Sequence, residues 1–470
     1  MRRAALGAAV LTAGLVAFPA LAEAHGLVGR QDLPIPRWLF AWAAAAVLVA
    51  SFVALAVLWP KPRLENNPHE RRVLALPRVL VPVCGAVGIA LFALVVYAGL
   101  AGTQTPTANL APTVVYVLFW VGLALVSLLF GDVFRAFNPW RAAGRAFGWV
   151  ARRVAGDRLP APLPYPARLG RWPAALGLLA FAWLELVYSG AEDPSVVAVA
   201  ALLYAAAQLV GMSLYGTEAW SRNGDAFGVY FGLLARLGPI DWRGRELWLR
   251  PFLAGAAGLA VVPGTVAVLV VLIGTTSFDG LSQGPGWNAV APDVQEWLVG
   301  LGLGQQGALA VVFTLGLLLA VAVVAALYRL GTSGMRSVDE RFSSAELARR
   351  FAHSLLPIAL AYVVAHYFSY LTVQGQAIGY LASDPLGNGS NFLGTATASI
   401  NYGLVSANFI WYVQVGALVL GHVAGLVLAH ERALTVYSDP RAASRSQYFM
   451  LGVMVAFTSL GLWLLSAQNA

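Results

Sequence analysis

Long apolar stretches alternate with short polar segments along almost the whole chain. Ten stretches have about the 20 residues that an α-helix needs to cross the hydrocarbon of a bilayer. They are continuously apolar, whereas the strands of a membrane barrel are apolar at every second position, so the pattern predicts helices. The predicted spans are 38–59, 79–102, 113–131, 172–190, 195–214, 252–275, 306–328, 353–374, 408–430 and 448–466.

The polar segments between these spans alternate in charge. All 26 Lys and Arg residues beyond Arg37 lie in every second segment, namely 60–78, 132–171, 215–251, 329–352 and 431–447. Neither residue type occurs in the segments between them, which are 103–112, 191–194, 276–305 and 375–407. Short loops rich in Lys and Arg remain in the cytoplasm, so the pattern predicts a multi-pass protein with its amino and carboxyl ends outside.

The composition also fits a protein dissolved in a bilayer. The chain is 59% hydrophobic and 11% charged, whereas soluble domains carry about 25% charged residues. We therefore expect an all-α integral membrane protein, with residues 25–470 forming a single helical domain. The net charge of +8 follows the alternation of the loops, which predicts the lipid bilayer, and no nucleic acid, as the partner. Cys84 is the only cysteine, which excludes an intrachain disulfide.

Residues 1–24 have the pattern of a signal peptide. Arg2 and Arg3 precede an apolar core at 4–18, and Ala22-Glu23-Ala24 fits a small-x-small cleavage site. Cleavage would make His25 the first residue of the mature chain. The alternative is an uncleaved first helix, which leaves the predicted topology unchanged.

Four of the polar segments are long enough to have a structure of their own. The segments 134–153 and 225–236 combine aromatic residues with Arg, which predicts helices lying in the headgroup layer. The outer segments 276–305 and 375–407 would either cover an outward-facing cavity or form solvated connectors.

The eighth predicted span carries a polar stripe. Tyr362, His366, Tyr370 and Gln374 recur at every fourth residue, so they share one slowly drifting helix face. Ionisable side chains are rare and costly in a membrane, which makes His366 the first candidate for a functional residue. The other interpretation is that each polar side chain makes a structural hydrogen bond between helices.

Two further polar residues are predicted at a similar depth. With a rise of ~1.5 Å per residue, His366 lies about 12 Å, Gln414 about 9 Å and Glu185 about 8 Å below the outer boundary. We therefore predict a polar cavity in the outer half of the membrane. His366, Tyr370 and Glu185 are the candidate catalytic residues, and Tyr362, Gln374 and Gln414 the candidate substrate-binding residues.

The histidines allow several cofactors. His366 and His422 could hold one zinc or copper ion or a single haem, since imidazole suits all three. A mature amino-terminal His25 could chelate a metal through its amine and imidazole, with His366 as a further ligand. Two haems are not expected, because His422 and His430 are 8 residues apart, whereas His353 and His366 are 13 apart. His353 and His430 are predicted to be titrating surface residues at the inner boundary.

Arg30 and Arg37 are the only mature basic residues on the predicted outer side. Their position opposes the charge rule for membrane topology. They could bind an anionic group of a substrate, or Arg30 could pair with Asp32.

Three segments resemble a known family. They are HGLVGRQDLPIPRWLF at 25–40, FNPWR at 137–141 and GHVAGLVLAHERAL at 421–434. They look like motifs of multi-pass bacterial membrane proteins commonly labelled fenitrothion hydrolase, and the likeness extends over the whole chain. The resemblance implies a protein of the bacterial plasma membrane that cleaves organophosphate esters, and it brings no catalytic residues with it.

Three functional hypotheses follow. The first is a membrane hydrolase in which a metal-bound or base-activated water attacks a small apolar phosphotriester, with His366 as ligand or base. The second is a transporter or a metal-handling permease. The third is a redox or assembly factor that holds one haem or copper ion.

Overall fold

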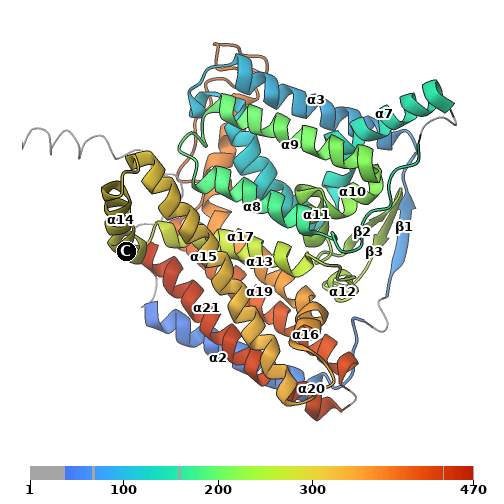
Figure 1. The fold of residues 1–470 in the computed structure, drawn as a ribbon, viewed down its shortest axis with the longest axis vertical. Helices are drawn as coiled ribbons and strands as arrows, with labels where there is room; N and C mark the ends of the chain where they lie inside the picture. The colour runs from blue at the N-terminus through green and yellow to red at the C-terminus, as the bar shows by residue number, and fades with distance from the viewer. Residues whose placement is uncertain (1–36, 66–68, 157–159, 438, 469–470) are drawn as a thin grey trace, which may run out of the picture.

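The computed structural model describes residues 37–65, 69–156, 160–437 and 439–468 of this chain. Long helices dominate the structure (Figure 1). The predicted signal peptide, His25 and Arg30 lie outside the described residues. The helix that fills the first predicted span begins at Arg37.

Among the described residues, seven helical segments are long and apolar enough to cross a membrane. They are Leu80–Ala101, Leu110–Phe130, Pro194–Tyr215, Thr265–Ser282, Gln305–Ser337, Ser344–Leu381 and Ala407–Val436. Two shorter apolar helices, Trp42–Leu58 and Trp172–Leu186, occupy two more of the predicted spans. The structure is therefore consistent with a helical membrane protein, and the number of ten spans stays a prediction.

The helices at the predicted spans have the following bounds: α2 Arg37–Leu58, α3 Leu80–Ala101, α4 Leu110–Pro112 with the π-helix η2 Thr113–Gly122 and α5 Leu123–Phe130, α8 Trp172–Leu186, α9 Pro194–Tyr215, α13 Thr265–Ser282, α15 Gln305–Gly334, α17 Leu355–Gln374, α19 Ala407–Val436 and α21 Tyr448–Gln468. Shorter helices connect them: η1 Pro106–Ala108, α6 Val133–Phe137, α7 Pro139–Ala155, α10 Thr217–Asn223, α11 Ala226–Leu234, α12 Ala254–Ala257, α14 Pro285–Gly300, η4 Met335–Ser337, α16 Ser344–Phe351, η5 Ala352–Ser354, η6 Gly375–Ala377, α18 Ile378–Leu381 and α20 Pro440–Ser446.

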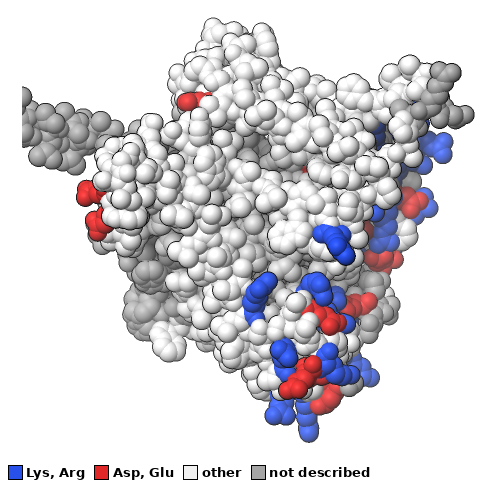
Figure 2. All heavy atoms as spheres, viewed as in Figure 1, with Lys and Arg blue, Asp and Glu red and all other residues white. Residues whose placement is uncertain are grey.

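The segments rich in Lys and Arg meet at one end of the molecule. Strands β1 (Arg71–Ala75), β2 (Ile240–Arg243) and β3 (Glu246–Leu249) form an antiparallel sheet in the order β1-β3-β2. Arg71 is opposite Leu249 in this sheet, so two basic segments are joined directly. Figure 2 shows Lys and Arg gathered along the lower and right edges, beside a broad surface without charge.

Two of the segments without Lys or Arg, 103–112 and 375–407, meet one another elsewhere, and the first also contacts Ser195, which directly follows the segment 191–194. The Thr103 amide donates a hydrogen bond to the Leu386 carbonyl at 2.8 Å, and the Ser195 amide donates one to Gln104 at 3.1 Å. Tyr380 reaches the Thr107 carbonyl at 3.1 Å. The sorting of the two kinds of segment agrees with the charge alternation, and the assignment of one end to the cytoplasm stays a prediction.

The sixth predicted span lies further along the chain than the hydrophobic pattern indicates. The chain makes a short helix, α12, and α13 begins only at Thr265. Gly264 before it has a φ of +81°, and the preceding Pro263 carbonyl accepts a hydrogen bond from the Arg171 amide at 2.7 Å. The start at Thr265 shifts the helix towards the predicted outer loop 276–305, and α14 fills most of the rest of that loop.

The segment 225–236 differs from its prediction as a helix in the headgroup layer. Helix α11 is buried, and Phe227, Tyr230 and Phe231 are each at most 5% exposed. Its aromatic rings pack against Phe119 and Trp120 of η2, because large apolar side chains lie on more than one face of this helix. In contrast, α7 within 134–153 leaves several apolar side chains exposed.

Helices α17 and α19 pack closely through small residues. A Cβ atom added at Gly421 would lie 2.3 Å from the Cβ of Ala361, and one at Gly425 would lie 3.0 Å from the Ser354 carbonyl oxygen. Gly421 and Gly425 therefore allow a close contact between the two helices. This contact fixes α17, which carries the predicted polar stripe.

Candidate functional site

The centre of the candidate site is a buried pair of ionisable side chains from two apolar helices. His366 of α17 lies with its Nε2 atom 2.8 Å from the Oδ2 atom of Asp279 on α13. The hydroxyl of Tyr367 donates a hydrogen bond to the same carboxylate oxygen at 2.8 Å. Asp279 is 3% exposed, so the three side chains meet in the interior.

Helix α13 positions Asp279 because it runs past the end of the predicted span. Its hydroxyl side chains bond to its own carbonyls, as Thr276 does to Leu272 at 3.0 Å, so they do not interrupt the helix. Gln283, one turn further, donates a hydrogen bond to Asp279 Oδ1 at 3.3 Å. The carboxylate is therefore bonded through both of its oxygens.

Glu185 and Tyr370 lie in the same region of the structure. Glu185 of α8 interacts electrostatically with Asp279, and Tyr370 of α17 with both carboxylates. Tyr116 of the π-helix η2 also interacts with Glu185, while its hydroxyl donates to the Ala191 carbonyl at 2.8 Å. π-helical turns are frequent at functional sites, where they shift a side chain out of α-helical register.

The structure places Gln414 near the level of His366. The close contacts of Gly421 with Ala361 and of Gly425 with Ser354 show how antiparallel α17 and α19 pair. The same register puts Gln414 opposite the turn that contains His366. Gln414 is 5% exposed, and its Oε1 atom has no hydrogen-bond partner among the described residues.

Two predicted substrate-binding residues have other surroundings. Tyr362 stacks on Phe457 of α21, with ring centroids 5.5 Å apart. Gln374 is half-buried at the end of α17. The outer segment 375–407 is held instead by Gln376, which accepts a hydrogen bond from the Asn401 amide at 3.0 Å.

His422 does not share the surroundings of His366. Its ring packs near Tyr362 at 6.3 Å between centroids, and its Nδ1 atom lies 2.8 Å from the carbonyl of Leu418 in its own helix. Among the described residues, no group of three or more His, Cys, Asp or Glu side chains is placed to hold a metal ion. For the predicted zinc, copper or haem site, the potential ligands that lie together are therefore His366 and Asp279. The other predicted ligand, His25, lies outside the described residues.

His353 and His430 are buried, which corrects the prediction that they are surface residues. The Nε2 atom of His353 lies 3.2 Å from the Leu428 carbonyl, and that of His430 lies 3.0 Å from the Trp59 carbonyl. They are at most 1% exposed. Both imidazoles therefore connect chain segments at the basic end of the molecule.

The motif FNPWR is anchored by two acidic residues of the next basic segment. Asn138 and Trp140 each donate a hydrogen bond to Asp225 Oδ2 at 2.7 Å. Arg141 binds Glu218 through two nitrogen atoms, at 3.1 and 3.0 Å. These contacts attach α7 to α10 and α11, and they give the motif a structural role.

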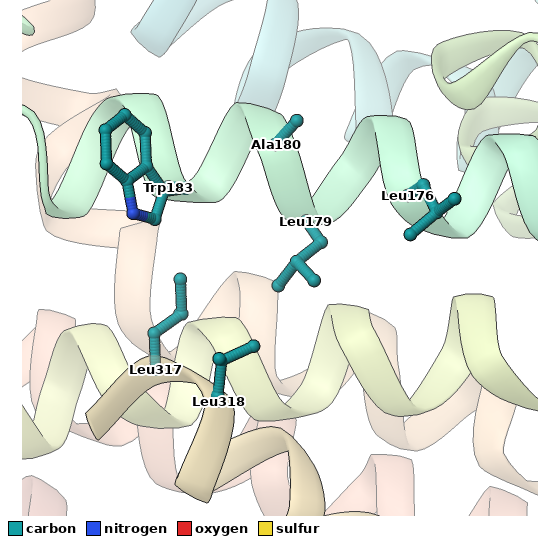
Figure 3. Close-up of a pocket in the computed structure, with 6 residues that line it drawn as sticks. All are labelled: Leu176, Leu179, Ala180, Trp183, Leu317 and Leu318. Carbon is teal, nitrogen blue, oxygen red and sulfur yellow. The ribbon is translucent and has the colours of Figure 1, made fainter. Parts of the chain in front are cut away.

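An apolar groove lies between α8 and α15. It has a volume of ≈ 300 Å³ and is lined by Leu176, Leu179, Ala180, Trp183, Leu317 and Leu318 (Figure 3). Trp183 donates a hydrogen bond to Thr314 at 2.8 Å, which links the two helices. The side chains that line this groove include neither Asp279 nor His366.

Asp279 and Tyr367 are the site residues that sequence reasoning missed. The polar run Thr275-Thr276-Ser277 lowers the local hydrophobicity, so the sequence predicts Asp279 within the outer loop 276–305. The available signal was that Ser and Thr side chains can remain in a membrane helix by bonding to preceding carbonyls. Tyr367 is next to His366 but lies outside the four-residue stripe.

These features define a class: a helical protein, consistent with a membrane location, that has an interior Asp–His–Tyr cluster. Comparisons of the chain with protein-family models, curated proteins and solved structures gave no match. The resemblance to the fenitrothion hydrolase family therefore stays a prediction.

Proposed function

We propose that this protein is a membrane transport protein in which the Asp279–His366 pair carries a proton, either as the transported ion or as the ion that drives a small solute. The observation behind this proposal is the convergence of Asp279, His366 and Glu185 from three apolar helices. Ionisable residues inside membranes commonly serve as proton relays or line substrate and ion pathways. A structural hydrogen bond between helices would need only one polar pair.

The geometry suits the reversible binding of one proton. With Asp279 ionised and His366 neutral, the pair has a charge of −1, and a proton added to the imidazole makes the pair neutral. The neutral ring donates its Nε2–H group to Asp279 Oδ2 across the 2.8 Å contact, and Tyr367 donates to the same oxygen. The added proton would therefore bind Nδ1 of His366. Because an unbalanced charge is expensive in a low-dielectric interior, protonation can favour one arrangement of the helices over another.

Nearby polar atoms offer positions for water. Gln414 Oε1 and the Tyr230 hydroxyl are buried and have no hydrogen-bond partner among the described residues. Buried groups of this kind are often satisfied by ordered water. A proton path needs only such waters and side chains, and no cavity of the size of a ligand.

Proton flux into liposomes tests the proposal. Purified protein is reconstituted with a pH-sensitive dye inside, and a potassium diffusion potential drives protons, without solute and then with mixed amino acids, sugars and organic acids outside. We expect flux above that of empty liposomes, and a return to that background in Asp279→Asn and His366→Gln. His422→Gln, which changes another buried histidine in a neighbouring helix, is the matched control and should retain the flux.

Two results would contradict transport. One is a wild-type flux equal to that of empty liposomes under every solute condition, with incorporation of the protein verified. The other is flux that survives both Asp279→Asn and His366→Gln.

The hydrolase hypothesis is the second candidate, and one observation favours it. A carboxylate bonded to one imidazole nitrogen orients the ring for general-base catalysis, as the Asp279–His366 contact would do. The family resemblance adds an organophosphate ester as the expected substrate. Release of nitrophenol from paraoxon that depends on His366 but not on His422, without proton flux, would replace the transport proposal with this one.

A further inference from the structure

We propose that a hollow between α7 and α10, at the basic end of the molecule, binds the phosphate group of one anionic phospholipid. The hollow has a volume of ≈ 280 Å³ and is lined by Gly144, Arg145, Gly148, Arg152, Thr217 and Glu218. Its two helices lie close together in Figure 1. Neither proton transport nor hydrolysis accounts for this feature.

The charges around the hollow are unequal. Three guanidinium groups, from Arg135, Arg141 and Arg145, lie within 3.4, 3.0 and 2.8 Å of the single carboxylate of Glu218. Burial by itself would raise the pKa of Glu218, but hydrogen bonds from Arg141 and the positive charges of Arg145 and Arg135 lower it overall. Glu218 is thus ionised at neutral pH, and the four side chains have a net charge of +2.

Two glycines one turn apart make room on the α7 side. A Cβ atom at Gly144 would lie 3.0 Å from Met212 Sδ and 3.1 Å from Thr217 Oγ1, so α7 approaches the neighbouring helices closely there. At Gly148, an added Cβ atom would meet only Arg152 Nη1, at 3.6 Å. Arg145 and Arg152 are about 10 Å apart along the helix, on either side of the space left by Gly148.

The second half of α7 has the character of a helix at a membrane surface. Phe147, Val150 and Val154 recur at helical spacing, and all three are exposed. Arg153 lies over the ring of Trp149, 4.8 Å from its centroid, in a cation–π contact. An apolar stripe beside arginines suits a helix in the headgroup layer, so a phospholipid is favoured over a soluble phosphate.

Lipid binding by the purified full-length protein tests this inference. Native mass spectrometry in detergent measures retention of added phosphatidylglycerol and phosphatidylcholine. We expect the wild type to prefer phosphatidylglycerol, and Arg152→Gln to weaken that lipid at least about fivefold, the effect of one basic side chain near an anionic surface. Gly148→Leu should also weaken binding, because its side chain fills the hollow.

Two matched controls separate the site from general effects. Arg336→Gln removes an exposed arginine of another basic segment, and Gly452→Leu makes the same change at a helical glycine with open space around it. Neither should change binding. A phosphatidylglycerol preference that survives both Arg152→Gln and Gly148→Leu, or that falls equally in the controls, would overturn the inference. Inorganic phosphate that displaces the lipid at equal concentration would show that the hollow recognises phosphate without its lipid.

Discussion

Replacing Glu431 by Gln should release the segment that connects α2 to the sheet. The Glu431 carboxylate is fully buried and accepts hydrogen bonds from the indole of Trp59 and from successive backbone amides of Arg63 and Leu64. The Arg63 amide is 2.8 Å from Oε1, and the Leu64 amide is 2.9 Å from Oε2. The charged carboxylate therefore holds residues 59–65 against α19.

The expected loss in the free energy of unfolding follows from the number of hydrogen-bond donors that lose their acceptor in Glu431→Gln. A glutamine keeps one acceptor oxygen, and its NH₂ group would face the donors that the second carboxylate oxygen of Glu431 binds. At least two charge-assisted hydrogen bonds are therefore lost. Each contributes about 1.5–3 kcal/mol, and relief of the buried charge offsets part of that loss. We expect Glu431→Gln to lower the free energy of unfolding by about 3 kcal/mol.

Limited trypsin digestion of the purified protein gives a local measurement. The Arg63–Leu64 bond should be protected in the wild type, because the backbone amides of both residues donate to Glu431, and cleaved rapidly in Glu431→Gln. Mass spectrometry identifies the site, and thermal unfolding in detergent reports global stability. Glu346→Gln, which breaks a helical pair with Arg350 at 2.7 Å, is the control and should change stability by less than about 0.5 kcal/mol. Protection of the Arg63–Leu64 bond in Glu431→Gln, together with wild-type stability, would refute this reasoning.

Three further substitutions test other parts of the fold. Burial raises the pKa of Asp132 from 3.8 to about 6, so ionisation of this side chain lowers the stability of the fold as the pH rises from about 4 to 6. Asp132→Asn should therefore raise the free energy of unfolding by up to about 3 kcal/mol at pH 7.5 and leave the melting temperature unchanged near pH 4. Gly264→Ala puts a Cβ atom 2.4 Å from the Trp172 amide nitrogen at a φ of +81°, so it should lower the free energy of unfolding by at least about 1–3 kcal/mol, as measured by thermal unfolding. Gly452→Ala, at a glycine with open space around it, is the control and should cause no loss. Trp140→Phe removes a donor to buried Asp225 and should cost about 1–3 kcal/mol in the same assay.

The sequence predicted the broad organisation because lipid imposes a simple rule on composition. A run of about 20 apolar residues is sufficient to indicate a helix, and the charge alternation anticipated which segments meet at each end. The sheet was not predicted, since its strands are short, lie within polar segments and pair Arg71 with Leu249. The pairing of β1 with β3 joins segments far apart in the chain and leaves no local pattern, and the hairpin of β2 and β3 has only four residues in each strand.

The site was predicted in part for a related reason. His366 and Tyr370 lie on one helix, so their periodicity is visible in the sequence. The partner of His366 depends on where α13 begins, which is set by the left-handed conformation of Gly264 and its contact with the segment before α8. Because α13 begins later than predicted, Asp279 lies in the interior and not in the predicted outer loop. The periodicity of α17 carries no information about where α13 begins.

The contacts of the family-like motifs affect what the resemblance can imply. In FNPWR, Asn138 and Trp140 bind Asp225, and in GHVAGLVLAHERAL, Glu431 holds the segment 59–65. These interactions fix chain segments at the basic end. The candidate site residues Asp279, His366 and Glu185 lie outside all three motifs. The motif contacts are therefore structural, and any chemistry would have to be tested at the Asp279–His366 pair itself.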